Sequence, residues 1–148
     1  MQTIKIEIPK GFVIDSFDKQ LGEIKFKEAP KDVKERIKTV TDVLADNGLT
    51  PEQFDIQCEG LEPDEVGYRL AKLIAKSLNE GWTPDWNNSS EGKYVPWFYM
   101  GGSSGFRYNG CDYWRSLSGV GSRLCFKTRE LAEYAGNQFT EVYKQFML

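Results

Sequence analysis

The residues best suited to chemistry in this sequence are aromatic and cationic side chains that alternate within one stretch, residues 82–126. This stretch contains all four tryptophans and eleven of the twenty aromatic residues. Single-stranded nucleic acids are bound by aromatic faces that stack on bases and by cations that neutralise phosphates. The ligand-binding candidates that fit these two roles are Trp86, Trp97, Tyr99, Arg107, Tyr108, Tyr113, Trp114, Arg115 and Arg123.

The charge of the chain is unevenly distributed. The formal net charge is −3, but residues 93–129 carry six Lys and Arg side chains against a single Asp. This segment therefore has a net charge of +5, and the rest of the chain has −8. Such an asymmetry indicates a site for an anionic partner. Arginines in an aromatic-rich sheet also stack on rings and pair with carboxylates, and this alternative stays open.

Each aromatic ring also has an interpretation as a core residue, because aromatic side chains dominate protein cores as well as interfaces. In a strand, Phe106 and Tyr108 point to one face and Arg107 points to the other, so the rings and cations of one strand do not all share a surface. No RNP-type motif or helix-turn-helix pattern accompanies them. The sequence therefore predicts an aromatic patch and leaves open which of its rings are exposed.

The sequence lacks histidines and paired cysteines, which are the usual ligands of zinc and iron. It contains no histidine, the commonest general base and a frequent ligand of zinc and iron. The cysteines Cys58, Cys111 and Cys125 include no Cys-x-x-Cys pair, so the sequence indicates neither a zinc site nor a disulfide framework. We predict no metal, no cofactor and no catalytic set.

Two alternative functions stay open. An exposed aromatic patch also suits docking on another protein, which makes a protein-interaction or assembly factor the first alternative. The second alternative is a carbohydrate-directed or hydrolytic enzyme that uses two of Asp85, Glu91 and Asp112 as a carboxylate pair. The spacing of these three residues selects no particular pair.

The hydropathy pattern argues against a membrane protein. No apolar run approaches the roughly 18 residues that a membrane span needs. Residues 1–8 alternate polar and apolar side chains, unlike the apolar core of a signal peptide. We therefore expect a soluble cytoplasmic protein without a membrane partner.

The predicted strands come from alternating or short apolar runs. They are residues 3–8, 12–14 and 23–27 in an N-terminal meander, and 93–100, 106–109, 112–117 and 122–126 in the aromatic stretch. Pro96 favours an edge position or a bulge for its strand.

Three helices are predicted from apolar residues at spacings of three and four. The first opens with Pro30 and ends at Asn47 and Gly48, with a break near residue 40 if Thr41 caps a separate short helix. The others are 63–80 and 129–146, the last with Thr128 as its N-cap. The predicted fold is α+β, with one domain over residues 1–148 and an antiparallel or mixed sheet, built from the meander and the aromatic strands, packed by two to three helices.

Three segments resemble a family of small uncharacterised proteins encoded by gut bacteria, their phages and integrated prophages. The segments are residues 78–86, residues 93–98, and residues 121–127 followed by 129–136. The resemblance covers roughly the C-terminal half of the chain. It implies a phage or mobile-element setting and an intracellular protein, and it supplies no activity, cofactor or catalytic residue.

Taken together, the sequence favours a small non-enzymatic binding protein that recognises an anionic partner. Single-stranded nucleic acid is the most specific form of this hypothesis, since it would use both the rings and the cations of the aromatic stretch. The sequence makes no prediction about oligomeric state.

Overall fold

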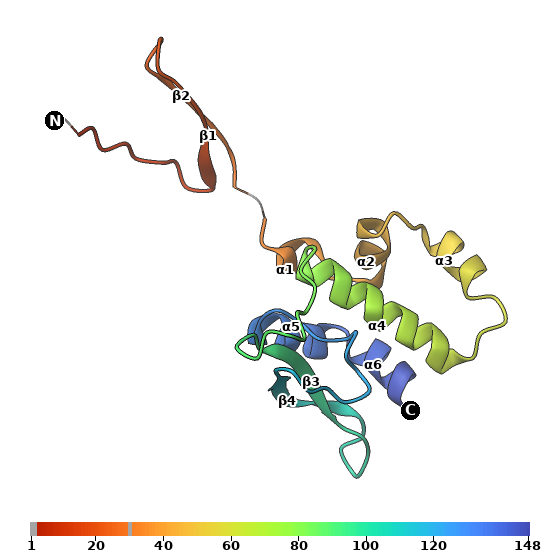
Figure 1. Cartoon of the computed structure of the whole chain (residues 1–148). Helices are drawn as coiled ribbons and strands as arrows, with labels where there is room; N and C mark the ends of the chain where they lie inside the picture. Colours follow the sequence, from red (N-terminus) through yellow and green to blue (C-terminus); the bar gives the residue numbers. More distant parts are fainter. Residues whose placement is uncertain (1–2, 30) are drawn as a thin grey trace. The chain divides into compact units, whose positions relative to one another are not determined.

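The computed structural model describes residues 3–29 and 31–148, and the chain divides into two compact units, residues 1–32 and 33–148 (Figure 1). The first unit contains β1 (Phe12–Asp18) and β2 (Glu23–Glu28). The second contains α1 (Val33–Arg36), α2 (Val40–Asp46), α3 (Pro51–Gln57), α4 (Pro63–Asn79), β3 (Lys93–Tyr99), β4 (Arg107–Trp114), α5 (Arg129–Gln138) and α6 (Thr140–Met147).

The α+β class is confirmed. The two hairpins form separate antiparallel sheets rather than the single sheet expected, and the assignment of residues 1–148 to one domain stays a prediction.

The first unit is an amphipathic hairpin. The Asp18 carboxylate and Gly22, with φ of 69°, form the turn between β1 and β2. Asp15 is an extra residue in β1, because Ile14 pairs with one residue of β2 and Ser16 with the next. A bulge shifts the side-chain alternation by one residue, and this one keeps Phe17 on the same face as Ile14.

The strand predicted for residues 3–8 is wrong. This segment is extended without strand pairing, and the side chains of Ile4, Ile6 and Ile8 are 84%, 48% and 49% exposed. A strand requires a hydrogen-bonded neighbour, and within the described residues no strand pairs with this segment. The predicted helix start at Pro30 lies outside the described residues.

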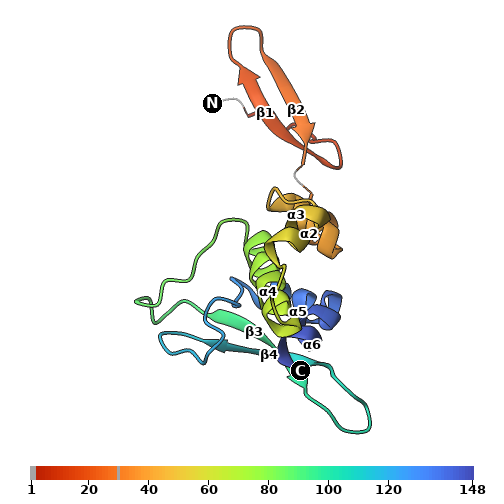
Figure 2. The same cartoon turned by 90° about the vertical axis from the view of Figure 1, so that its right-hand side faces the viewer.

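The second unit is built around α4, which packs against α1, α2, α5 and α6 (Figures 1 and 2). Its buried stripe includes Leu70, Ala71, Ile74 and Leu78, which are at most 8% exposed. Gly67 lets the backbone of α6 approach closely, since a Cβ atom there would lie 2.7 Å from the Phe146 nitrogen. The predicted helix over 63–80 is therefore confirmed as the central element of this core.

Two predicted helices are interrupted. The first is divided into α1 and α2 near the expected place, but the N-cap of α2 is Thr39 rather than Thr41. Thr39 and Asp42 form a capping box: the Thr39 hydroxyl accepts a hydrogen bond from the Asp42 N–H, and the Asp42 carboxylate accepts one from the Thr39 N–H. The last predicted helix begins at the Thr128 cap as expected but breaks at Phe139. There the Thr140 hydroxyl donates a 2.7 Å hydrogen bond to the Gly136 carbonyl, a side-chain contact that often bends helices.

The aromatic stretch contains one long hairpin. The strands predicted at 106–109 and 112–117 merge into the single strand β4, and residues 115–117 lie outside it. The strand predicted at 122–126 is reduced to one bridge, in which Tyr94 and Phe126 exchange backbone hydrogen bonds of 3.0 and 2.8 Å. Pro96 lies two residues beyond Tyr94, so its backbone nitrogen faces the same edge of β3, away from β4. Within the described residues no strand pairs with that edge at Pro96. The edge position predicted for Pro96 is therefore confirmed.

Candidate functional site

The inner face of the β3–β4 hairpin packs against α5 and α6. Phe98 lies 4.9 Å from Phe106 and 4.9 Å from Tyr143 between ring centroids. Tyr108 lies against α5 at Gly136, where a Cβ atom would be 2.5 Å from the Tyr108 ring. The inner rings are therefore core residues, and burial also raises the pKa of Tyr108. This places the predicted site residue Tyr108 in the packing of the fold.

The outer face of β3 changes from buried to exposed along its length. The four residues that share this face are Lys93, Val95, Trp97 and Tyr99, and they are 0%, 8%, 53% and 47% exposed. The base of the face is covered, whereas its tip presents two large rings to solvent. Trp97 pairs with Gly110 across the hairpin, so no side chain opposite it covers the indole.

The exposed rings share the hairpin tip with one cation. Arg107 pairs with Tyr99 across the two strands, and its guanidinium carbon lies 4.1 Å from the centroid of the Tyr99 ring. Arginine stacked in this way uses its flat face for the ring and keeps its N–H edges free for another acceptor. Trp97, Tyr99 and Arg107 together form what we call the tip patch.

The other predicted site residues lie elsewhere in the second unit. Tyr113 contacts Tyr94, at 5.8 Å between ring centroids, and the Arg115 guanidinium carbon lies 5.8 Å from the centroid of Tyr113. Trp114 is half-buried against the loop of Gly119 and Gly121. The remaining two candidates are the half-buried Trp86 and the exposed Arg123. Of the nine candidates, the structure brings Trp97, Tyr99 and Arg107 together on one exposed face.

One cation of the +5 segment is structural. The Lys93 ammonium group lies inside the loop formed by residues 85–92 and donates hydrogen bonds to the carbonyls of Asp85, Asn88 and Glu91. It is also 5.3 Å from the centroid of the Trp86 ring. Lys93 is therefore not available to an external anion, and the half-buried Trp86 contacts it in the same loop.

The three carboxylates considered for hydrolysis take part in local hydrogen bonds. Glu91 Oε1 accepts a 2.9 Å hydrogen bond from the Asp85 N–H and lies 3.3 Å from Lys93 Nζ, and these contacts hold the pKa of Glu91 below its ordinary value. Asp112 accepts a 2.8 Å hydrogen bond from the Tyr113 N–H. A carboxyl group that acts as a general acid near neutral pH needs a raised pKa. The contacts of Glu91 lower its pKa instead, so they do not suit it to that role. In residues 3–29 and 31–148, no group of three metal-ligating side chains is found.

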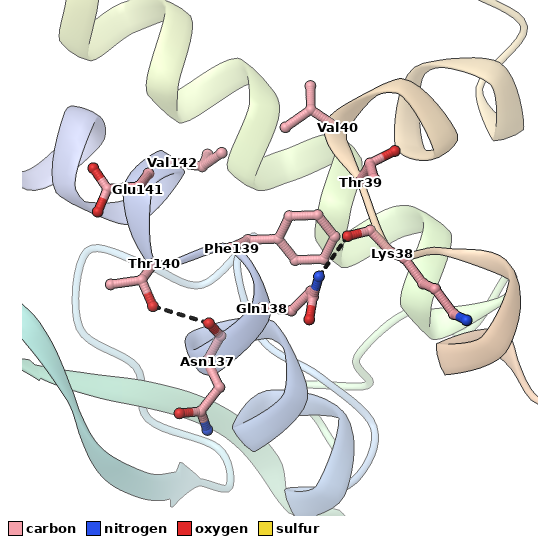
Figure 3. A pocket seen from close by; sticks show the side chains of 9 residues that line it. All are labelled: Lys38, Thr39, Val40, Asn137, Gln138, Phe139, Thr140, Glu141 and Val142. Atoms are coloured by element: carbon pink, nitrogen blue, oxygen red, sulfur yellow. Dashed lines mark hydrogen bonds between the residues drawn. The ribbon is translucent and has the colours of Figure 1, made fainter.

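Two surface depressions lie away from the predicted residues. The first, of about 280 Å³, lies between the α1–α2 connection and the break between α5 and α6 (Figure 3). Gln138 crosses it and donates a 2.6 Å hydrogen bond to the Lys38 carbonyl. The second, of about 510 Å³, is lined by α4 and by Phe146. The second depression also has a ring with a cation, since Lys72 Nζ lies 5.2 Å from the centroid of the Tyr68 ring. Its rings, Tyr68 and Phe146, are half-buried, whereas Trp97 and Tyr99 of the tip patch are exposed. No sequence motif indicated either depression.

Over the described part of the chain, no helix is both long and apolar enough to cross a membrane. Comparison of the chain with models of known protein families, with curated proteins and with solved structures found no match.

Proposed function

We propose that this protein binds a flexible anionic ligand on the tip patch, and that the ligand is single-stranded nucleic acid. The observation that carries the proposal is the exposure of Trp97 and Tyr99 on one face, with Arg107 stacked on Tyr99. No catalytic step is part of the proposal. The resemblance to proteins of gut bacteria and their phages adds a mobile-element setting and a cytoplasmic location.

The spacing of the two rings fits this ligand. Residues two apart on a strand are separated by roughly 6.6 Å, so Trp97 and Tyr99 offer two separate stacking surfaces to an extended chain. Each stacked base contributes about 1–3 kcal/mol in proteins that bind single strands. Arg107 supplies N–H donors beside the second ring, where a phosphate between two bases would lie.

Docking on another protein is the second candidate function, and the same patch supports it. Tryptophan, tyrosine and arginine are the residue types most enriched among the dominant contacts of protein interfaces. The two functions differ in their dependence on salt, because neutralised phosphates release counterions when nucleic acid binds. A protein interface that depends mainly on the apolar area of Trp97 has no such steep dependence.

The experiment is a fluorescence titration of the full chain with single-stranded oligonucleotides at low and high salt. We expect saturable quenching of tryptophan emission that weakens steeply as salt increases. Trp97→Phe keeps a stacking ring but removes the exposed indole. This variant should therefore lose most of the quenching. It should retain most of the affinity for the oligonucleotide, measured by fluorescence anisotropy of a labelled strand.

Arg107→Ala should weaken binding and reduce the salt slope by about 0.7, the value for one phosphate contact on a single strand. Its matched control is Arg69→Ala, which removes an exposed arginine from α4. A flat titration of folded protein at low salt would overturn the nucleic-acid proposal. Equal effects of Arg107→Ala and Arg69→Ala would indicate general electrostatic attraction instead of a site at the tip patch.

A further inference from the structure

The first unit carries two uncovered apolar surfaces. The first is one face of the β1–β2 hairpin, which consists of Phe12, Ile14, Phe17, Ile24 and Phe26, with exposed fractions of 41%, 47% and 55% for the three residues from β1. The second is the row of Ile4, Ile6 and Ile8 on the extended segment that precedes β1. A two-stranded hairpin by itself is marginally stable in water, and exposed apolar rows of this kind mark interaction surfaces.

We propose that residues 4–8 pair with the same residues of a second copy of this chain, as antiparallel strands related by a two-fold axis at Ile6. The segment reads Ile-Lys-Ile-Glu-Ile. It has the alternation of a strand but no strand partner within the described part of its own chain. A second copy supplies that partner through an isologous contact, in which each copy contributes the same surface.

The charges of the segment select this partner and this register. With Ile6 opposite Ile6 of the second copy, Ile4 lies opposite Ile8, and Lys5 lies opposite Glu7 on both sides of the axis. All isoleucines then share one face of the paired strands, and two ion pairs occupy the other. Opposite charges directly across two strands stabilise the pairing, whereas like charges destabilise it.

Other registers of the same segment are less favourable. Moving the axis by one residue toward the N-terminus places Lys5 opposite Lys5, and moving it toward the C-terminus places Glu7 opposite Glu7. A parallel pairing in register brings both like-charged pairs together. The antiparallel register about Ile6 is therefore specified by charge as well as by the apolar row.

The hairpin of the same unit gives the paired strands a place to pack. On its apolar face Phe12, Ile14 and Phe17 are exposed, and Ile24 and Phe26 beside them are half-buried. Six isoleucines on one face of the paired strands need such a surface, since an isolated pair of strands buries too little apolar area to be stable. Self-association would remove both uncovered surfaces from water together.

The test is sedimentation velocity of the full chain over a concentration series, with charge-reversed variants. The wild-type chain should dimerise reversibly. Lys5→Glu and Glu7→Lys each place like charges opposite one another in both cross-strand pairs, so each variant alone should raise the dimer dissociation constant about tenfold or more. An equimolar mixture of the two variants restores both opposite-charge pairs and should dimerise as well as the wild type.

Lys19→Glu is the matched control, because it makes the same charge change at an exposed position in the β1–β2 turn, outside the pairing segment. It should leave the dissociation constant unchanged. A wild-type chain that stays monomeric throughout the series would overturn the proposal and show that these surfaces serve another partner or the rest of the chain. A dimer that resists both reversals, or a mixture that fails to recover, would also overturn it, by placing the contact elsewhere.

Discussion

The Lys93 ammonium group donates a 2.6 Å hydrogen bond to the backbone carbonyl of Asp85, eight residues earlier in the chain. Carbonyls of Asn88 and Glu91 accept its other two donors at 3.1 and 3.0 Å, and the Glu91 carboxylate balances its charge. The Lys93 side chain has no exposed surface. One buried cation therefore organises the loop over residues 85–92, which leads directly into the hairpin of the tip patch.

Lys93→Met should destabilise the protein by roughly 2–3 kcal/mol, because it leaves the carbonyls of Asp85, Asn88 and Glu91 without the donor that they share inside the loop. Methionine matches the length of the lysine stem, so the loss is one of charge and hydrogen bonding rather than of volume. The measurement is urea denaturation followed by circular dichroism. Lys76→Met, an exposed lysine of α4, is the control and should change stability little. An unchanged denaturation midpoint in Lys93→Met would contradict the structural role of this cation.

Glu91 should make the stability depend on pH in the acid range. Hydrogen bonding from the Asp85 N–H, with the nearby Lys93, lowers its pKa from the ordinary value of 4.5. A carboxylate whose pKa is lower in the folded state than in the unfolded state stabilises the fold above the unfolded pKa, and this contribution is lost as pH falls through the folded pKa. Glu91→Gln should therefore be less stable than the wild type near neutral pH, and the difference should narrow below pH 4.5.

The check on Glu91 is a series of urea midpoints for both proteins from neutral to acid pH. Glu59→Gln removes one negative charge from an exposed turn after α3 and serves as the control for net charge. If the difference between wild type and Glu91→Gln stays constant over the series, the titration of Glu91 is not coupled to folding.

The sequence predicted those parts of the fold that are set by local chemistry. The β1–β2 turn follows from Asp18 and Gly22, the start of α5 from the Thr128 cap, and the extent of α4 from its apolar stripe. In each of these, the residues that make the structure are within a few positions of one another. Propensity and periodicity describe such elements well.

The candidate site was less predictable, because its exposure depends on which face of the hairpin the helices cover. Alternation correctly separates Arg107 from Phe106 and Tyr108, but the packed face is fixed by tertiary contacts such as the fit of Tyr108 against Gly136. The burial of Lys93 depends on three carbonyls of a loop, and carbonyls leave no signal in a sequence. The strand predicted for residues 3–8 has the right pattern but no partner within the described chain.

Asn79 connects the end of α4 to the segment that pairs with β3. Its buried side chain donates a 2.9 Å hydrogen bond to the Cys125 carbonyl and accepts one of 2.9 Å from the Lys127 N–H. Asn79→Ala leaves both backbone groups without these bonds and should cost about 2 kcal/mol in denaturant unfolding. Asn79→Asp keeps the acceptor but not the donor and should also be destabilised. Asn137→Ala on the exposed side of α5 is the control, and an equal effect there would contradict a special role for Asn79.

Gly136 should be intolerant of alanine even though it lies within a helix. Alanine is favoured over glycine in helices by about 1 kcal/mol, so propensity alone predicts that Gly136→Ala stabilises α5. The added Cβ atom would lie 2.5 Å from the Tyr108 ring and 2.9 Å from Pro96 Cβ, inside van der Waals contact. We expect a net loss of about 1–3 kcal/mol in thermal or urea unfolding, typical of an overpacked core.

A double-mutant cycle identifies the cause of that loss. Tyr108→Ala removes the ring that the new methyl group would meet, so Gly136→Ala should cost less in the Tyr108→Ala background than in the wild type. The coupling free energy between the two substitutions measures the steric conflict directly. Additive effects would show that the cost arises elsewhere, and a stabilised single variant would mean that the inner face of the hairpin does not pack on α5 as closely as the 2.5 Å approach requires.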